Sequence, residues 1–286
     1  QVVNIYNNTN TPWIGDVITS SRDTLYRSKG AGLDTVLYIK KIDGCDEVSI
    51  REIEVINNLY AQVKVYLDGP MTLSGEMRCF TAFDFPQNDA GTAYISPYDN
   101  TVNLDLNKFL SDPVTTEKKF PDGNTWCDWI YLRIMDQSFV YVDSVCGLLR
   151  QDGIVCDMEG NPYIAFAQLE VNTSYYIVVE HQNHISVRSE NTYLFSTNFE
   201  RPTLIDLTNP SNICSNGNEG PLRLVFDKYC MYAGDLNRDG TVSTADVIVL
   251  KNYEGSYLYD INQDGATAFT SDKIKIIENN AQGTLF

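Results

Sequence analysis

The residues with the clearest chemistry lie near the C-terminus, in the segment GDLNRDGTVSTAD of residues 234–246. Oxygen-bearing side chains alternate there at the spacing of a calcium loop, in which positions 1, 3, 5, 7, 9 and 12 supply ligands. The residues at these positions are Asp235, Asn237, Asp239, Thr241, Ser243 and Asp246. Gly240 at position 6 permits the sharp bend, and Thr241 offers its backbone carbonyl. The pattern predicts a bound Ca²⁺, and the competing interpretation is a solvated acidic turn.

A second segment, DINQDGATAFTSD of residues 260–272, repeats the first half of this pattern 25 residues later. The matching positions hold Asp260, Asn262, Asp264 and Ala266. Ala266 can offer only its backbone carbonyl. The closing carboxylate, Asp272, falls one residue late, so the second loop is one residue longer than the first. We therefore expect a second Ca²⁺ with less regular geometry, which makes two calcium ions in all.

The elements that must position these loops are a short helix after each loop and a β-rich region before them. In that region Val63, Val65 and Leu67 alternate with polar residues, which is the period of a half-buried strand. A similar alternation runs from Ile130 to Ile134. Further strands are expected at 35–42, 48–56, 101–106, 139–145, 163–169, 175–187 and 222–226. Many short strands predict a mainly β fold, a β-sandwich or jelly-roll-like region, and we expect no amphipathic helix before about residue 244.

The character of the sequence changes near residue 230, where we place a domain boundary. Residues 1–230 form the predicted β-rich region, and residues 231–286 form a small module with two calcium loops and two short helices. A second boundary near residue 60 is the weaker prediction, because residues 1–60 are few for a core of their own.

The composition is strongly acidic, with 38 acidic and 21 basic residues and a net charge of −17. Nucleic-acid recognition needs a basic face, so this balance argues against it, and it argues equally against docking on anionic membranes. No apolar run approaches the roughly 20 residues that span a bilayer. Residues 231–286 carry eight acidic and four basic residues, a charge that two Ca²⁺ ions would neutralise. The remaining negative charge suits the solubility of an exported surface.

The seven cysteines lack the close pairs of a zinc or thioredoxin-like site. In an exported chain they would form about three disulfides and leave one thiol over. Cys146 and Cys156 are the best local candidates for a disulfide, because they flank a turn at residues 151–153. In a cytosolic chain they would be buried thiols, and the sequence leaves both interpretations open. The chain begins at Gln1, which a removed signal peptide explains and an artificial truncation explains equally.

Taken in order, several motifs resemble the C-terminal regions of large exported surface proteins of Bacteroidota, the kind carried by type IX secretion. The matching segments are VYLDGP at 65–70, DWIYL at 128–132, LLRQDGIVCD at 148–157, YYIVVEHQNHI at 175–185 and AGDLNRDG at 233–240. The paired loops are similar to dockerin repeats, in which Asp replaces the closing Glu of an EF-hand. The cysteines depart from the family pattern, and so does Glu180, where the family has a basic residue. The resemblance implies a secreted, cell-surface protein.

Two short patterns mark candidate glycosylation sites. Asn7 and Asn172 fit the N-glycosylation pattern, in which Ser or Thr stands two residues later. Thr24, Thr35 and Ser144 each lie between an Asp and an aliphatic residue. The Bacteroidota resemblance associates this second pattern with O-glycosylation.

No residue set points to catalysis, so we predict no catalytic residues and no organic cofactor. His181 and His184 are the only histidines, and in one continuous strand their side chains would point to opposite faces. The resemblance implies a structural role for them. A carbohydrate-active hydrolase is the alternative, although none of the many carboxylates stands out as a catalytic pair. Trp13, Trp126 and Trp129 could form a sugar-stacking platform, but the alternating strand beside Trp129 favours a core position.

These observations lead to two functional hypotheses. The first is an extracellular structural protein, a calcium-stabilised and glycosylated subunit of a surface filament or matrix. Its terminal strand, Gln1–Asn7, would add to the sheet of a neighbouring copy and so build a homo-oligomer, or it would pair within its own subunit. The second is an adhesion module that binds a glycan or a cohesin-like protein. Both hypotheses exclude nucleic acid and a membrane span.

Overall fold

Internal contacts in the computed structural model divide the chain into two compact units, residues 1–58 and residues 59–286. The structure describes backbone and side chains for 58–79, 96–99, 123–214, 222–253, 258–263 and 270–280. It describes the backbone alone for 15–19, 23–28, 32–42, 45–55, 93–95, 103–105, 110–111, 118–119, 257 and 269. Each structural statement below refers to these residues.

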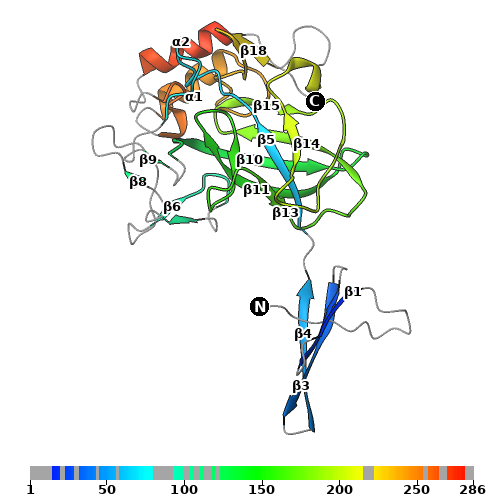
Figure 1. Ribbon diagram of the computed structural model, residues 1–286. Coiled ribbons are helices and arrows are strands. Elements are labelled where there is room, and N and C mark those ends of the chain that lie inside the picture. The colour runs from blue at the N-terminus through cyan, green and yellow to red at the C-terminus, as the bar shows by residue number, and fades with distance from the viewer. Residues whose placement is uncertain are drawn as a thin grey trace. The chain divides into compact units, whose positions relative to one another are not determined.

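The first unit contains a four-stranded antiparallel sheet with the strand order β1-β2-β3-β4 (Figure 1). Its strands are β1 (Gly15–Thr19), β2 (Asp23–Ser28), β3 (Gly32–Ile42) and β4 (Cys45–Val55). The strands β3 and β4 pair along their whole length, from Gly32 opposite Val55 to Ile42 opposite Cys45. The predicted strands at 35–42 and 48–56 are thus confirmed, and β1 and β4 form the two outer edges of this sheet.

The second unit is built on a main sheet with the order β12-β11-β10-β14-β15, to which β16 adds by pairing with β14. The strands are β10 (Trp126–Met135), β11 (Tyr141–Arg150), β12 (Val155–Cys156), β14 (Ser174–His181), β15 (His184–Arg188) and β16 (Tyr193–Leu194). In β10 the side chains of Ile130, Leu132 and Ile134 are all fully buried. The alternation predicted for this strand is therefore confirmed, because every second residue faces the core.

A smaller sheet, with the order β13-β5-β17, shares this core. Its strands are β5 (Leu59–Lys64), β13 (Ile164–Phe166) and β17 (Thr203–Asp206), and β17 runs parallel to β5. Buried and half-buried residues alternate along β5. The other strands pair two by two as β6 (Ala93–Ile95) with β7 (Asn103–Asp105), β8 (Leu110–Ser111) with β9 (Lys118–Lys119), and β18 (Leu222–Val225) with β19 (Lys228–Met231).

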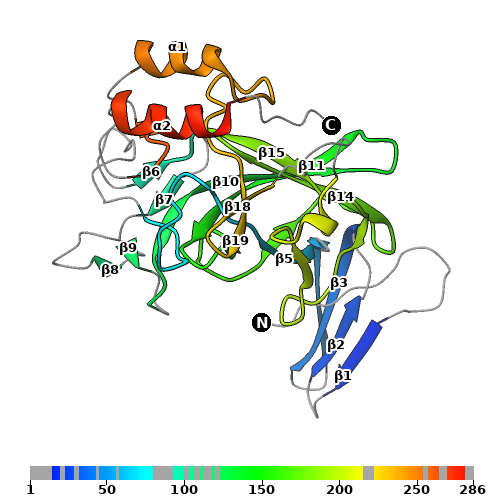
Figure 2. The same cartoon turned by 90° about the horizontal axis from the view of Figure 1, so that it is seen from above.

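The helices follow the two predicted loops. The helices α1 (Thr244–Asn252) and α2 (Phe269–Asn279) lie side by side (Figure 2). The 3₁₀ turns η2 (Pro210–Asn212) and η3 (Tyr257–Tyr259) complete the elements. Ser243 caps α1, since its hydroxyl accepts a hydrogen bond from the Ala245 N–H at 3.1 Å. As expected, no α-helix precedes residue 244 among the described residues.

The mainly β class is confirmed, and the loops pack into the same compact unit as the sheets. One cluster of buried side chains joins Leu236, Leu250, Ile261 and Ile276 to Ile185 of β15. The boundary predicted near residue 230 thus falls inside the second unit, and whether residues 231–286 also fold alone stays a prediction. The jelly-roll order stays a prediction too. Within the described part of the chain, no helix is long and apolar enough to cross a membrane.

The prediction of a disulfide between Cys146 and Cys156 is wrong, since both residues are free buried thiols in the structure. In the β11–β12 ladder Cys156 lies opposite Leu148, and Leu148 is two residues beyond Cys146. Cys146 and Cys156 are therefore diagonal neighbours, which lie too far apart for a disulfide. The structure pairs Cys79 with Cys127 instead. Sequence spacing missed this bond because its two halves are 48 residues apart.

The tryptophans form no sugar-stacking platform in the described structure. Trp126 and Trp129 are both buried and pack edge to face, with ring centres 5.6 Å apart. The core interpretation of Trp129 is therefore confirmed. Trp13 lies outside the described residues.

Candidate functional site

The first predicted calcium loop folds around the carboxylate of Asp235, a residue that is 2% exposed. Its two oxygens accept hydrogen bonds from the N–H of Asp239 at 3.1 Å and of Gly240 at 3.0 Å. The side-chain oxygen of Asn237 accepts from the same Asp239 N–H at 3.1 Å. The amide nitrogen of Asn237 donates to Asp239 Oδ2 at 2.8 Å. Three predicted ligands therefore converge on one turn of the backbone.

The carboxylate of Asp246 closes this loop from the first turn of α1. Its Oδ1 accepts hydrogen bonds from the N–H of Leu236 at 2.8 Å and of Asn237 at 3.1 Å, and its Oδ2 accepts from the N–H of Ser243 at 2.7 Å. Two predicted ligands, Ser243 and Asp246, thus also form the capping box that starts the helix. The N–H of Thr241 donates to Asp239 Oδ1 at 2.9 Å, which holds Thr241 in the same loop.

The electrostatics of the first loop favour a cation. Burial raises the pKa of Asp235 to about 6, and the nearby carboxylates of Asp246 and Asp239 add to the rise, while the N–H of Gly240 opposes it. A buried carboxylate with two acidic neighbours is stabilised when a cation joins them. The side chains that converge here present oxygen atoms, which is the ligand type that Ca²⁺ prefers. The residues therefore fit a hard divalent cation.

Among the described side chains, no three His, Cys, Asp or Glu groups are already gathered as a metal site. A calcium loop also takes ligands from Asn, Ser, Thr and backbone oxygens. Calcium in the first loop consequently stays a prediction, one that the oxygen-rich geometry fits.

The second loop closes in the same way as the first. Asp260 is buried like Asp235, and Asp272 is buried like Asp246. Asp272 Oδ1 accepts from the N–H of Ile261 at 2.8 Å and of Asn262 at 3.3 Å, and these residues are the counterparts of Leu236 and Asn237. The late closing carboxylate therefore reaches the equivalent place despite the extra residue. Asp264 and Ala266 lie outside the described residues.

The fourth position of each loop has the same backbone and a different role. Arg238 has a φ of 59° and Gln263 a φ of 53°, so both are left-handed. Arg238 is exposed. Gln263 is buried, and its amide nitrogen donates to Asp128 Oδ2 at 2.7 Å. One loop therefore presents this position to solvent, and the other uses it to hold the main sheet.

Asp128 is the centre of a buried polar network, here called the histidine junction, formed by Asp128, His181, Asn183, His184 and Gln263. Besides Gln263, Asp128 Oδ2 contacts His181 Nε2 at 2.9 Å, and Asp128 Oδ1 accepts from the Trp129 N–H at 2.7 Å. The Nδ1 atoms of His181 and His184 lie 2.9 Å apart. The side chain of Asn183 donates to the carbonyl of Leu258 at 3.2 Å. The junction thus joins the β14–β15 hairpin to the second loop.

The two histidines lie on the same side of the sheet, so the expectation that they face opposite sides is wrong. Residues 175–187 are not one strand, because a turn separates β14 from β15 and places His181 opposite His184. Directly opposed residues of an antiparallel pair share a face. Their rings meet edge to face, with centres 4.7 Å apart.

A backbone hydrogen bond indicates the proton position on His184. The N–H of Gly69 donates to His184 Nε2 at 3.2 Å, so that nitrogen carries no proton. The proton of neutral His184 then sits on Nδ1, whereas His181 Nδ1 lies 2.9 Å from His184 Nδ1 and 3.1 Å from the side-chain oxygen of Asn183. Burial lowers the pKa of His184 well below its usual value, and the charges of His181 and Lys275 lower it further. His184 is consequently neutral at pH 7.

A second buried network, here called the Asp68 cluster, holds α2. The fully buried carboxylate of Asp68 contacts Lys275 at 3.1 Å, Arg223 at 3.1 Å and the side-chain amide of Asn279 at 2.7 Å. The same Asn279 nitrogen donates to the carbonyl of Ala233 at 2.9 Å. Each network is centred on a fully buried carboxylate, Asp68 or Asp128, with several partners, which is the condition under which burial of a charge is tolerated.

The motif segments far apart in the sequence meet at these two networks. Segment 65–70 supplies Asp68 and Gly69, segment 128–132 supplies Asp128, and segment 175–185 supplies the histidines. The start of segment 233–240 contributes the N–H of Gly234, which donates to the carbonyl of Asn183 at 2.7 Å. Sequence reasoning treated these residues as a series of strands and did not find the junction. The only signal was charged or polar residues inside apolar runs.

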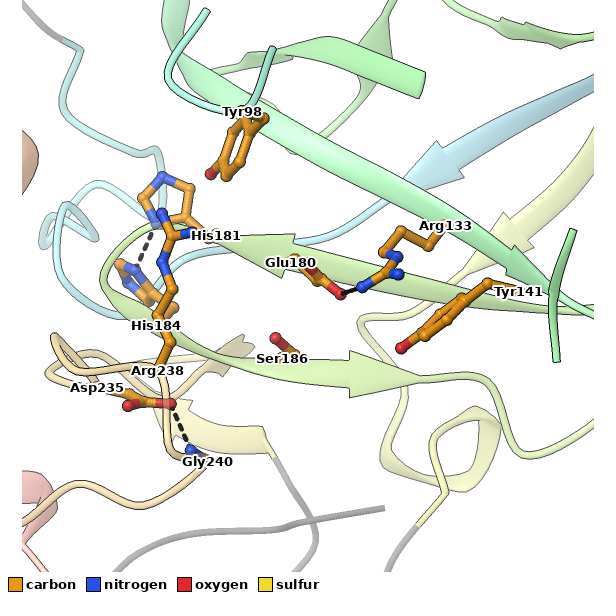
Figure 3. Close-up of a pocket in the computed structure, with 10 residues that line it drawn as sticks. All are labelled: Tyr98, Arg133, Tyr141, Glu180, His181, His184, Ser186, Asp235, Arg238 and Gly240. Atoms are coloured by element: carbon orange, nitrogen blue, oxygen red, sulfur yellow. Dashed lines mark hydrogen bonds and ion pairs between the residues drawn. The ribbon is translucent and has the colours of Figure 1, made fainter. Parts of the chain in front are cut away.

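A cavity of about 310 Å³ lies beside the first loop (Figure 3). Its wall on the main sheet carries Arg133, Tyr141, Glu180 and Ser186, and the first loop contributes Asp235, Arg238 and Gly240. Tyr98, His181 and His184 complete the lining. The sequence did not reveal this cavity, because its walls come from five separate segments.

The candidate glycosylation residues fall in different settings. Asn172 is exposed in a turn with a φ of 65°, and the Ser144 hydroxyl is exposed but lies 2.8 Å from the Tyr131 hydroxyl. Thr24 lies in β2 and Thr35 in β3, where only the backbone is described. Asn7 lies outside the described residues.

No protein-family model, curated protein or solved structure matches this chain. Its function is therefore argued from its own residues.

Proposed function

We propose that this chain is a calcium-stabilised structural protein of the cell exterior, in which each loop–helix repeat binds one Ca²⁺. The observation that carries the proposal is the equivalent closure of the two loops. In each, a buried Asp from the following helix accepts the N–H groups of loop positions 2 and 3. A calcium ion in each repeat would hold each loop in the shape that docks its helix onto the β-sheets. The histidine junction and the Asp68 cluster already hold the second repeat there.

An exported location has two supports. The disulfide between Cys79 and Cys127 belongs to an oxidising compartment. The five motif segments resemble exported surface proteins of Bacteroidota, in which a dockerin-like calcium repeat ends the chain. Exposed Asn172 and Ser144 are candidate glycan acceptors on such a surface.

Self-association is the second part of the proposal. The open sheet of the first unit has outer strands β1 and β4, and β4 is 11 residues long. Outer strands present unpaired backbone groups that can accept a strand from another copy. Gln1–Asn7, the predicted donor strand, lies outside the described residues. Repeated head-to-tail, this contact would give a filament.

An adhesion module is the alternative function, and one observation favours it. Ile248 of α1 and Ile274 of α2 are 62% and 52% exposed at corresponding places in the two repeats. Paired apolar residues on two exposed helices suit a protein partner such as a cohesin-like domain. Pulldown with such a domain in calcium, compared with the Ile248→Ser variant, would separate this function from the structural one.

The proposal is tested by melting the full chain in calcium and in EDTA. A ligand that binds only the folded state adds about 2.7 kcal/mol at one hundred times its dissociation constant, so EDTA should lower the melting temperature by several degrees. Titration calorimetry should give two Ca²⁺ per chain. An unchanged melting curve would remove calcium from the proposal. Electron microscopy of the chain with and without Gln1–Asn7 tests the filament, and a full-length chain that stays monomeric at high concentration would reject it.

A further inference from the structure

The cavity beside the first loop contains two arginines, each placed on a tyrosine ring. The guanidinium carbon of Arg133 lies 3.4 Å from the ring centre of Tyr141, and that of Arg238 lies 5.7 Å from the ring centre of Tyr98. Tyr98 in turn stacks on Tyr131, with ring centres 5.3 Å apart and planes 11° apart. At 3.4 Å the Arg133 guanidinium is stacked on its ring, and at 5.7 Å Arg238 lies within cation–π range of Tyr98.

The arginine on the main sheet already has an acidic partner. Arg133 Nη1 lies 3.1 Å from Glu180 Oε1, and the side chains remain 33% and 26% exposed. The pair therefore offers N–H donors next to a carboxylate acceptor on the cavity wall (Figure 3). The hydroxyl of Ser186 lies on the same wall. Neighbouring donors and acceptors suit hydroxyl groups, since each hydroxyl both donates and accepts.

Among the described residues, the arginine on the loop has no such partner. Arg238 is exposed and makes no ion pair with any described residue. Arg238 has the same left-handed backbone at loop position 4 as Gln263, but it lines the cavity whereas Gln263 contacts Asp128 of the main sheet. A guanidinium that has no carboxylate partner among the described residues can receive a planar carboxylate in bidentate fashion.

We propose that this cavity binds a carboxylated sugar residue of an acidic polysaccharide. The carboxylate pairs with Arg238, and the ring hydroxyls bind the Arg133–Glu180 pair and Ser186. The cavity of about 310 Å³ is at the small end of ligand pockets, which suits one or two sugar rings. Neutral sugars would leave Arg238 without an anion, so the site distinguishes acidic from neutral sugars.

Calcium in the first loop, which rests on the proposed function, assists this binding. The loop carries three carboxylates and Arg238, a charge that one Ca²⁺ balances. An acidic ligand then meets no net repulsion from the loop. Acidic sugars should consequently bind more tightly in calcium than in EDTA.

The test is calorimetric titration of the full chain with a galacturonic acid trimer and with its methyl ester, at constant free calcium. We expect the acid to bind at least tenfold more tightly than the ester. The Arg238→Gln variant should lose at least tenfold in affinity for the acid, with calcium stoichiometry unchanged. The matched control is Arg201→Gln, which removes the same charge from an exposed position outside the cavity and should bind like the parent chain.

This inference would be overturned by equal binding of acid and ester, by full affinity in Arg238→Gln, or by no binding at millimolar trimer. Equal binding of a glutamate trimer would assign the cavity to acidic peptides instead and would also reject it. Each result can be read separately from the calcium melt. A chain stabilised by calcium that binds no acid trimer keeps the proposed function and loses this site, and the reverse outcome is equally distinct.

Discussion

The two loop–helix repeats share a backbone plan and differ in what they contact. Both bury the first Asp, both place a left-handed residue at position 4, and both close with an Asp from the following helix. The second repeat is fixed to the sheets through Gln263 and Asn279. The first repeat uses the equivalent of Gln263, which is Arg238, to line a cavity.

This difference indicates that the two repeats have separate roles, here called the division of labour: the second repeat is anchored to the sheets, and position 4 of the first repeat lines a cavity. A repeat that is anchored by buried polar groups cannot change its contacts without loss of stability. A repeat whose position 4 faces solvent is free to acquire a ligand. The following experiments test this difference between the repeats, in order of decreasing expected effect.

The largest effect should come from Gly69→Ala. A Cβ at residue 69 would overlap the backbone carbonyl of Ile261, which no rotamer change relieves. We expect the free energy of unfolding, measured with urea, to fall by more than about 3 kcal/mol, the upper range for ordinary overpacking, because the second repeat cannot dock. Gly123→Ala is the control, since nothing lies within 4 Å of its Cβ position and only its positive φ opposes the change. Equal stability of the two variants would contradict docking at Gly69.

The histidine junction should respond next, through Asp128→Asn. The change removes the buried charge that His181 and Gln263 contact, at an expected cost of about 3 kcal/mol in the free energy of unfolding. Asp227→Asn is the matched control, because Asp227 forms only a surface pair with Lys228 and should change stability by less than about 0.5 kcal/mol. A similar small change in both variants would show that the junction adds little stability.

Removing one calcium carboxylate at a time compares the repeats directly. Asp235→Asn and Asp260→Asn should each reduce the stoichiometry from two Ca²⁺ to one by calorimetry. Each loses up to about 2.7 kcal/mol of stabilisation at one hundred times the dissociation constant. Asp260→Asn should cost more stability, because its loop also holds Gln263 against the sheet. Asp235→Asn should instead weaken binding of the acidic sugar. The reverse assignment of these two effects would refute the division of labour.

The smallest effect is the pH dependence that His184 adds. Its folded pKa lies well below its unfolded value of about 6.5, so the unfolded chain binds the proton first as the pH falls. Stability is fully present above about pH 6.5 and falls by up to about 1.4 kcal/mol per pH unit below it, down to the folded pKa. Urea unfolding from pH 8 to pH 5 in saturating calcium measures the slope. The His184→Gln variant should show a flatter profile, and an unchanged slope would remove His184 as its source.

Alternation made the strands predictable, and local spacing made the loops predictable. Val63 lies in β5 and Ile130 in β10, and both side chains are buried. Because one side of each sheet must be buried, every second residue in the alternating part of these strands is apolar. The short helix expected after the first loop is α1, whose start at Ser243 and Asp246 is also set by local hydrogen bonds. The hairpin at His181 and His184 was missed, because Gln182-Asn183 carries no glycine or proline to mark the turn.

The mainly β class, the two loops and their oxygen-bearing residues could be read from the sequence, since these depend on neighbours within about a dozen positions. The fold was needed to show that Asp128 holds the second loop, that Asp68 holds α2, and that Arg238 lines a cavity. These contacts join residues more than 100 positions apart. Packing selects such partners. The sequence does not show which buried donor will pair with which buried acceptor, because that depends on the fold bringing the two atoms to about 3 Å.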